Sequence, residues 1–129
     1  MTNQIIRNAL LGCVLIGSAA AAEMASPKVT SYKTTKIDGL TIAYREAGDP
    51  ASPKLVLLHG FPASSHQYRD LIPALATRFH VIAPDYPGFG FSSQPSTSEF
   101  TYTFDNLANL IEAFIDTLGI TKLSMYVQD

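Results

Sequence analysis

The sequence has little that would direct it to a polyanion or to a disulfide framework. Its formal net charge is −2 and only 16% of its residues are charged, so neither a basic surface for nucleic acid nor an acidic, disordered tail is expected. Cys13 is the only cysteine, which excludes a disulfide within the chain. With 129 residues, 47% of them hydrophobic, the chain has the composition of a globular protein of at most one domain.

The longest apolar run is too short for a comfortable membrane span. It extends almost unbroken from Ala9 to Ala22, whereas a membrane helix needs about 20 apolar residues. Arg7 is the only charged residue before Glu23. A positive start, a short apolar centre and an Ala-x-Ala ending are typical of a secretory signal peptide. We therefore predict a signal peptide over residues 1–22, cleaved after Ala22, and a mature domain over residues 23–129.

Such a leader implies a secreted or periplasmic protein with no stable membrane association after cleavage. One alternative is a buried N-terminal helix, but a soluble helix would show polar residues at helical spacing. Another is a lipoprotein anchored at Cys13, because Leu10-Leu11-Gly12-Cys13 faintly matches a lipoprotein cleavage box. The apolar run continues well past Cys13, which favours the signal peptide.

Short apolar and alternating segments predict strands that alternate with helices. Strands are expected at residues 28–37, 40–46, 55–58, 80–83 and 123–127, and helices at residues 65–76 and 104–118. Asp38-Gly39 is a strong two-residue hairpin signal, so the first two strands should be antiparallel. The later strands alternate with helices, which predicts parallel pairing. The expected fold class is α/β, with a mixed, mostly parallel sheet and flanking helices.

Three of these segments carry more detailed predictions. Residues 40–46 alternate apolar and polar side chains, as in a strand with one covered face. Pro73 falls inside the first helix pattern, so that helix should be short or kinked. The second helix should begin after the N-cap Thr103 and stop at Gly119. Its expected buried stripe consists of Phe104, Leu107, Ala108, Ile111, Phe114, Ile115 and Leu118.

Three motifs with candidate chemistry accompany the third, fourth and fifth strands. They are Leu57-Leu58-His59-Gly60-Phe61-Pro62, Asp85-Tyr86-Pro87-Gly88-Phe89-Gly90-Phe91-Ser92 and Met125-Tyr126-Val127-Gln128-Asp129. Taken singly, the first is also consistent with a plain tight turn, and Asp129 with an exposed terminal residue. The second is not a phosphate loop, because Gly88-x-Gly90 lacks a third glycine and no helix begins directly behind it.

Together, and in this order, the motifs resemble the front half of the α/β-hydrolase fold, with the chain ending after the fifth strand. An Asp preceded by Val-Gln at this point resembles the epoxide hydrolase and haloalkane dehalogenase branch. The resemblance implies that Asp129 is the nucleophile and forms a covalent alkyl-enzyme ester. It also implies that the backbone N–H of Phe61 stabilises the oxyanion. Gly60 and Pro62 would then shape the turn, and His59 would tie the loop.

Within this branch, the resemblance favours an epoxide hydrolase. Phe61 stands where dehalogenases often place an Asn that can bind halide. A haloalkane dehalogenase remains one alternative, and a non-catalytic exported binding protein that retains half the fold is another. His66 and His80 do not lie where the family keeps its base, so both are interpreted as structural or surface residues. The implied partner is a small-molecule substrate, and the chemistry needs no metal or organic cofactor.

The chain stops before the residues that the family uses for turnover. The base histidine, the supporting acid, the cap domain and the second oxyanion donor would all come after Asp129. We therefore expect this polypeptide on its own to be catalytically inert. We also expect it to be poorly soluble, because the last strand would form an exposed apolar edge.

Overall fold

The computed structural model describes residues 29–129, so the predicted signal peptide and Cys13 lie outside the described residues. The strands of this region are β1 (Ser31–Ile37), β2 (Leu40–Ala47), β3 (Lys54–Leu58), β4 (His80–Pro84) and β5 (Leu123–Val127). The helices are the 3₁₀ helix η1 (Ser65–Tyr68) and the α-helices α1 (Leu71–Leu75) and α2 (Phe104–Thr117). All the predicted strands and helices are therefore present, with small shifts at their ends. Among residues 29–129, no helix has the length and apolar content required to cross a membrane.

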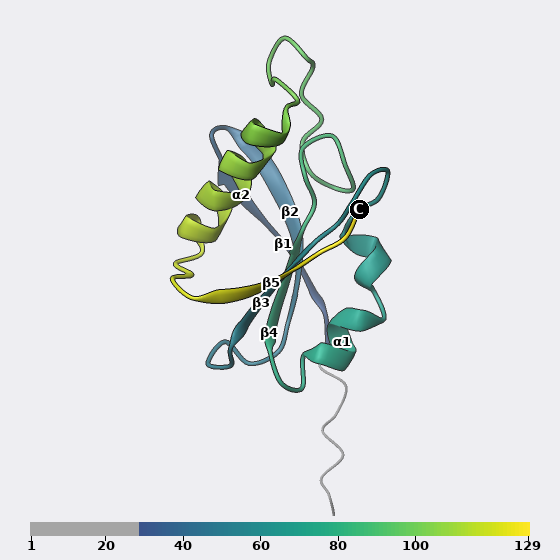
Figure 1. The fold of residues 1–129 in the computed structure, drawn as a ribbon, viewed down its shortest axis with the longest axis vertical. Helices are drawn as coiled ribbons and strands as arrows, with labels where there is room; N and C mark the ends of the chain where they lie inside the picture. Colours follow the sequence, from purple (N-terminus) through teal and green to yellow (C-terminus); the bar gives the residue numbers. More distant parts are fainter. Residues whose placement is uncertain (1–28) are drawn as a thin grey trace, which may run out of the picture.

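The strands form one mixed sheet in the order β1-β2-β4-β3-β5 (Figure 1). β2 pairs antiparallel with β1 and β4, whereas β3 pairs parallel with β4 and β5. The hairpin between β1 and β2 turns at Asp38 and Gly39, whose φ angles are 48° and 83°. Two positive φ values are what a two-residue hairpin turn of type I′ requires. The α/β fold class, the mixed sheet and the hairpin are thus confirmed.

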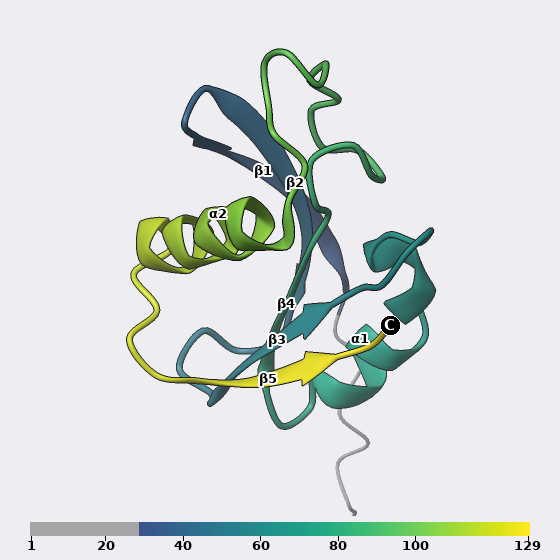
Figure 2. The same ribbon diagram turned by 45° about the horizontal axis from the view of Figure 1, so that its top comes forward.

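Helices cover both faces of the sheet (Figure 2). On one face, Leu110, Ile111 and Phe114 of α2 pack in a cluster with Ile42, Tyr44, Val56, Leu58 and Ile82. On the other face, Tyr68 of η1 and Ile72 of α1 pack in a cluster with Ala47, Leu57, Val81 and Ala83. Neighbouring residues of β3 and β4 therefore point into different clusters, which explains why both strands are apolar throughout.

The prediction that β2 has a single covered face is wrong. Ala43, Arg45 and Ala47 lie on the face predicted to be open, yet they are only 7%, 5% and 4% exposed. Ala47 packs in the cluster beneath α1. Arg45 is covered because its Nε donates a hydrogen bond of 3.1 Å to Ser65 Oγ of η1. The groups that cover this face come from later in the chain, so the local pattern of β2 does not contain them.

The segment that follows β3 is short, as Pro73 predicted. It divides into η1 and α1, with the break at Arg69 and Asp70 rather than at the proline. Pro73 is the third residue of α1, where a missing N–H removes no hydrogen bond within the helix. The resulting compact segment fits between the end of β3 and the start of β4.

Helix α2 begins and ends as predicted, but its buried stripe is partly wrong. Thr103 Oγ1 accepts a hydrogen bond from the Asn106 N–H, and Gly119 has a φ of 68°. Phe104 is 92% exposed, and Ala108 is exposed as well. The cause is that the part of α2 that packs on the sheet starts at Leu110, which the predicted stripe omitted.

Strand β5 forms one edge of the sheet within the described part of the chain. One side of it pairs with β3, and no strand among residues 29–129 pairs with the other side. Met125, Tyr126 and Val127 are 46%, 47% and 65% exposed. The expected apolar edge is therefore present, while the low solubility inferred from it stays a prediction.

Candidate active site

The end of β5 lies directly against the turn that follows β3. The parallel register places Val127 beside Leu58, and the Gln128 N–H donates to the Leu58 carbonyl at 3.2 Å. A Cβ atom placed on Gly60 would lie 2.7 Å from both the Cα and the carbonyl carbon of Asp129. Only glycine allows this approach, since real Cβ atoms do not come so close to backbone. The structure thus brings Asp129, at the C-terminus marked in Figure 2, together with the Gly60 turn.

The turn after β3 also bears the Phe61 N–H. The Ala63 N–H donates to the Gly60 carbonyl at 3.1 Å, which closes the turn around Phe61 and Pro62. No group among residues 29–129 accepts a hydrogen bond from the Phe61 N–H. The Phe61 side chain is 78% exposed and packs edge-on against Phe89, with 6.0 Å between ring centroids. This N–H, one residue after Gly60, is the group that the resemblance implies as the oxyanion donor.

His59 is a buried, neutral brace of this turn. It is 3% exposed, and its Nε2 accepts a hydrogen bond of 3.2 Å from the Tyr86 N–H. Its Nδ1 therefore carries the proton and donates to the Gly60 carbonyl at 2.9 Å. Burial lowers the pKa of His59 below its ordinary value of 6.5. With both nitrogens engaged, His59 ties the loop after β3 to the loop after β4 and is not free to act as a base.

The lowered pKa of His59 predicts a loss of stability in mild acid. The unfolded chain takes up a proton at this imidazole below pH 6.5, before the folded chain does. The free energy of unfolding should therefore keep the full contribution of His59 above pH 6.5. It should fall as the pH drops from 6.5 through the lowered pKa. Denaturant unfolding of the protein at pH 7.5, 6.5 and 5.5 measures the slope. The slope should shrink in His59→Gln and persist in His66→Gln, and an equal slope in all three proteins would contradict the assignment.

Asp85 begins the motif that follows β4, but the sequence alone assigned it no role. Its side chain is 2% exposed. Oδ1 accepts a hydrogen bond of 2.7 Å from the Ser65 N–H, and Oδ2 accepts one of 3.0 Å from the Phe91 N–H. The signal available in the sequence was an acidic residue directly after a buried strand, where a carboxylate needs backbone donors to remain buried.

The two remaining histidines lie elsewhere. His66 is exposed, and its Nδ1 lies 3.1 Å from Arg45 Nη2. His80 starts β4, at the opposite end of the parallel strands from Asp129, and its Nε2 lies 2.5 Å from Glu46 Oε1. Burial raises the pKa of Glu46, but hydrogen bonds from Lys33 and His80 outweigh it and hold that pKa below its ordinary value. Neither histidine is placed to act on Asp129.

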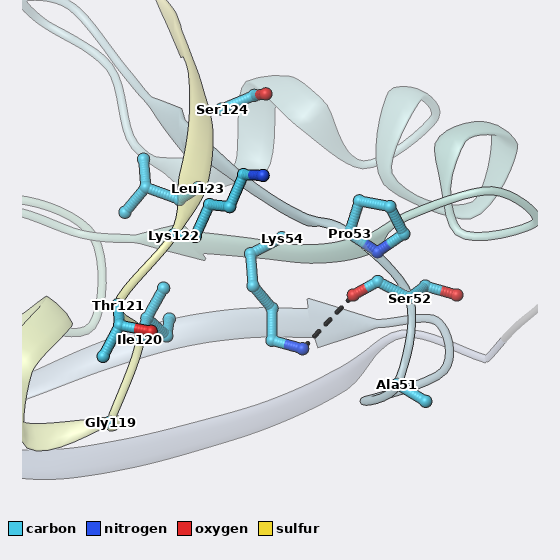
Figure 3. Close-up of a pocket in the computed structure, with 10 residues that line it drawn as sticks. All are labelled: Ala51, Ser52, Pro53, Lys54, Gly119, Ile120, Thr121, Lys122, Leu123 and Ser124. Atoms are coloured by element: carbon cyan, nitrogen blue, oxygen red, sulfur yellow. Dashed lines mark hydrogen bonds between the residues drawn. The ribbon is translucent and has the colours of Figure 1, made fainter.

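A hollow in the described surface lies away from this site (Figure 3). It lies where β3 and β5 begin, at the opposite end of the two strands from Asp129, and it is lined by residues 51–54 and 119–124. Within it, Lys54 Nζ donates to the carbonyl oxygens of Pro50 and Ser52. Among residues 29–129, no group of three His, Cys, Asp or Glu side chains is placed to hold a metal ion.

Asp129, at the end of β5, thus lies against a turn whose Phe61 N–H has no acceptor among residues 29–129. The family model described as the alpha/beta hydrolase fold matches residues 53–129. The chain therefore belongs to the α/β-hydrolase family, which confirms the resemblance drawn from the motifs.

Individual relatives agree with this assignment. The chain is 51% identical over 98 residues to an uncharacterized hydrolase, YNR064C, of Saccharomyces cerevisiae, covering 76% of this chain and 33% of that protein. It is 35% identical over 106 residues to a haloalkane dehalogenase of Bradyrhizobium diazoefficiens, covering 82% and 33%. The solved haloalkane dehalogenase DbeA from Bradyrhizobium elkani superimposes with a TM-score of 0.74 at 38% identity, covering 78% and 34%. The chain spans about a third of the length of the curated relatives it matches.

Proposed function

We propose that this chain carries the nucleophile and one oxyanion donor of a hydrolase that works through a covalent alkyl-enzyme ester. The observation that supports this is the contact between the end of β5 and Gly60, where a Cβ added to that glycine would lie 2.7 Å from the backbone of Asp129. A free N–H at Phe61 follows in the same turn. The end of β5 and the turn that bears this N–H lie at one end of the sheet, which is the arrangement that the proposed covalent catalysis requires.

In the proposed reaction, an Asp129 carboxylate oxygen attacks an electrophilic carbon of the substrate. A carbon–oxygen ester bond forms as the bond from that carbon to the leaving group breaks, and the leaving oxygen of an epoxide takes up a proton from water. Water then attacks the ester carbonyl, and the Phe61 N–H stabilises the oxyanion that forms. Collapse of this intermediate releases the alcohol and restores the carboxylate.

Epoxides are the proposed substrate class. The Phe61 side chain presents no polar atom to a departing ion, and a halide leaving group would need such donors. The oxygen of an opened epoxide stays attached to the substrate and needs only a proton. Haloalkanes are the second candidate, because relatives named haloalkane dehalogenase align with 35% identity over 106 residues.

Product analysis separates these candidates. The complete hydrolase that contains this chain is given a terminal alkyl epoxide or the bromoalkane of the same chain length, and diol and bromide are measured. We expect diol at the higher kcat/KM. Faster bromide release would assign the dehalogenase activity instead, and the absence of both products would contradict a carboxylate-dependent hydrolase.

The 129-residue chain alone should not catalyse repeated turnover of substrate. Its three histidines are His59, His66 and His80, and none of them is placed to activate water at the Asp129 ester. A base must therefore come from outside these 129 residues. We expect at most one equivalent of product or adduct per chain in an epoxide assay followed by intact-mass measurement. Sustained diol production by the purified chain would refute this.

A further inference from the structure

The loop after β3 is fastened to the loop after β4 at two points. His59 makes the first connection, because it joins the Tyr86 N–H to the Gly60 carbonyl. Asp85 makes the second, because its Oδ1 accepts the Ser65 N–H at 2.7 Å. Phe61 and its free N–H lie between these two points in the sequence. The position of that N–H relative to Asp129 therefore depends on both connections.

The carboxylate of Asp85 is itself held firmly. Its Oδ2 accepts the Phe91 N–H at 3.0 Å, and a Cβ on Gly90 would lie 2.1 Å from that oxygen. The Asp85 carbonyl accepts a hydrogen bond of 2.6 Å from Ser92 Oγ, which in turn accepts the Ala43 N–H at 2.9 Å. Asp85 thus connects the turn that bears the oxyanion donor to β2 and to the loop after β4.

We propose that Asp85 is a positioning residue, which fixes the Phe61 N–H opposite Asp129 through its paired hydrogen bonds to Ser65 and Phe91. The proposal rests on the proposed function of Asp129. A buried carboxylate that accepts two backbone N–H groups forms charge-assisted bonds at both oxygens. An amide of the same shape has one acceptor only, so its NH₂ group must face one of the two N–H donors. The Asn variant therefore releases either the loop after β3 or the loop after β4.

Asp85→Asn in the complete hydrolase should slow hydrolysis of the Asp129 ester more than it weakens substrate binding. Displacing a catalytic group by about 1 Å costs on the order of 100-fold in rate, so we expect kcat to fall about 10- to 100-fold with KM unchanged or lower. Gly90→Ala tests the same contact with Asp85 intact, because its Cβ would displace Oδ2. The rate at which the Asp129 ester is hydrolysed is measured in a single turnover by intact mass. Asp70→Asn, on an exposed side chain, is the matched control and should keep the wild-type rate.

Phe114→Leu tests whether the effect of Asp85→Asn comes only from lost stability. It weakens the core on the α2 face of the sheet. It is compared with Asp85→Asn at a temperature where both proteins are fully folded. Slow ester hydrolysis in Asp85→Asn and Gly90→Ala, with a normal rate in Phe114→Leu, supports positioning. A normal rate in Asp85→Asn, or an equal loss in Phe114→Leu, overturns it. The absence of any Asp129 ester in the wild-type enzyme would overturn the proposed function, and this proposal with it.

Discussion

Asp129→Asn should abolish hydrolysis by the complete enzyme, with kcat reduced by roughly 10,000-fold or more. In the proposed mechanism the Asp129 carboxylate forms and then loses the bond to the substrate, so no neighbouring group would replace it. Asp129→Ala removes the oxygen entirely and should give the same loss. Activity is measured as diol formed per enzyme over several hours, which makes even very slow turnover detectable.

The matched control for this prediction is Asp116→Asn on the exposed surface of α2. It makes the same chemical change away from the tip of β5 and should leave kcat within about twofold of wild type. Both variants should fold, because the Asp129 side chain is exposed and accepts no hydrogen bond from another group of residues 29–129. Near-normal turnover in Asp129→Ala would eliminate the covalent mechanism.

Gly60→Ala should lower kcat by about 100-fold or more while leaving a folded protein. The added Cβ would lie 2.7 Å from the Asp129 Cα and 2.8 Å from the Gln128 carbonyl oxygen. Both are backbone atoms that cannot rotate away, so the turn and the end of β5 must separate. Losing one oxyanion donor costs about 100- to 1,000-fold in kcat, and overpacking costs about 1–3 kcal/mol in stability.

Gly39→Ala separates the geometric effect from strain. Gly39 has a φ of 83° with nothing within 4 Å of an added Cβ, so this variant strains the hairpin without touching the site. It should lose stability and keep its kcat. If Gly39→Ala and Gly60→Ala lose activity equally, the contact between Gly60 and Asp129 has no special part in catalysis.

The sequence predicts those parts of the fold that depend on local chemistry. Asp38-Gly39 specifies a turn because both residues tolerate positive φ, and Thr103 caps α2 through its own side chain. The apolar run of β3 and the order of strands and helices together predict a parallel sheet. The proximity of Asp129 to Gly60 follows from this order, since the C-terminal ends of adjacent parallel strands meet at one edge of the sheet.

Features that depend on distant contacts could not be predicted in this way. Arg45 is buried by Ser65 of η1, which lies 20 residues away, and the exposure of Phe104 follows from where α2 meets the sheet. The role of Asp85 depends on two N–H groups supplied by different loops. A local pattern contains the residue types but not the tertiary packing that brings such donors together.

Single-turnover hydrolysis in water labelled with ¹⁸O tests the covalent role of Asp129 most directly. The complete enzyme is used in excess over an unlabelled epoxide, and the isotope content of the diol is read by mass spectrometry. Attack by Asp129 transfers one of its own oxygens, so the first diol released should contain only ¹⁶O. A first product that already carries ¹⁸O would mean that water attacks the substrate itself, and would contradict a nucleophilic Asp129.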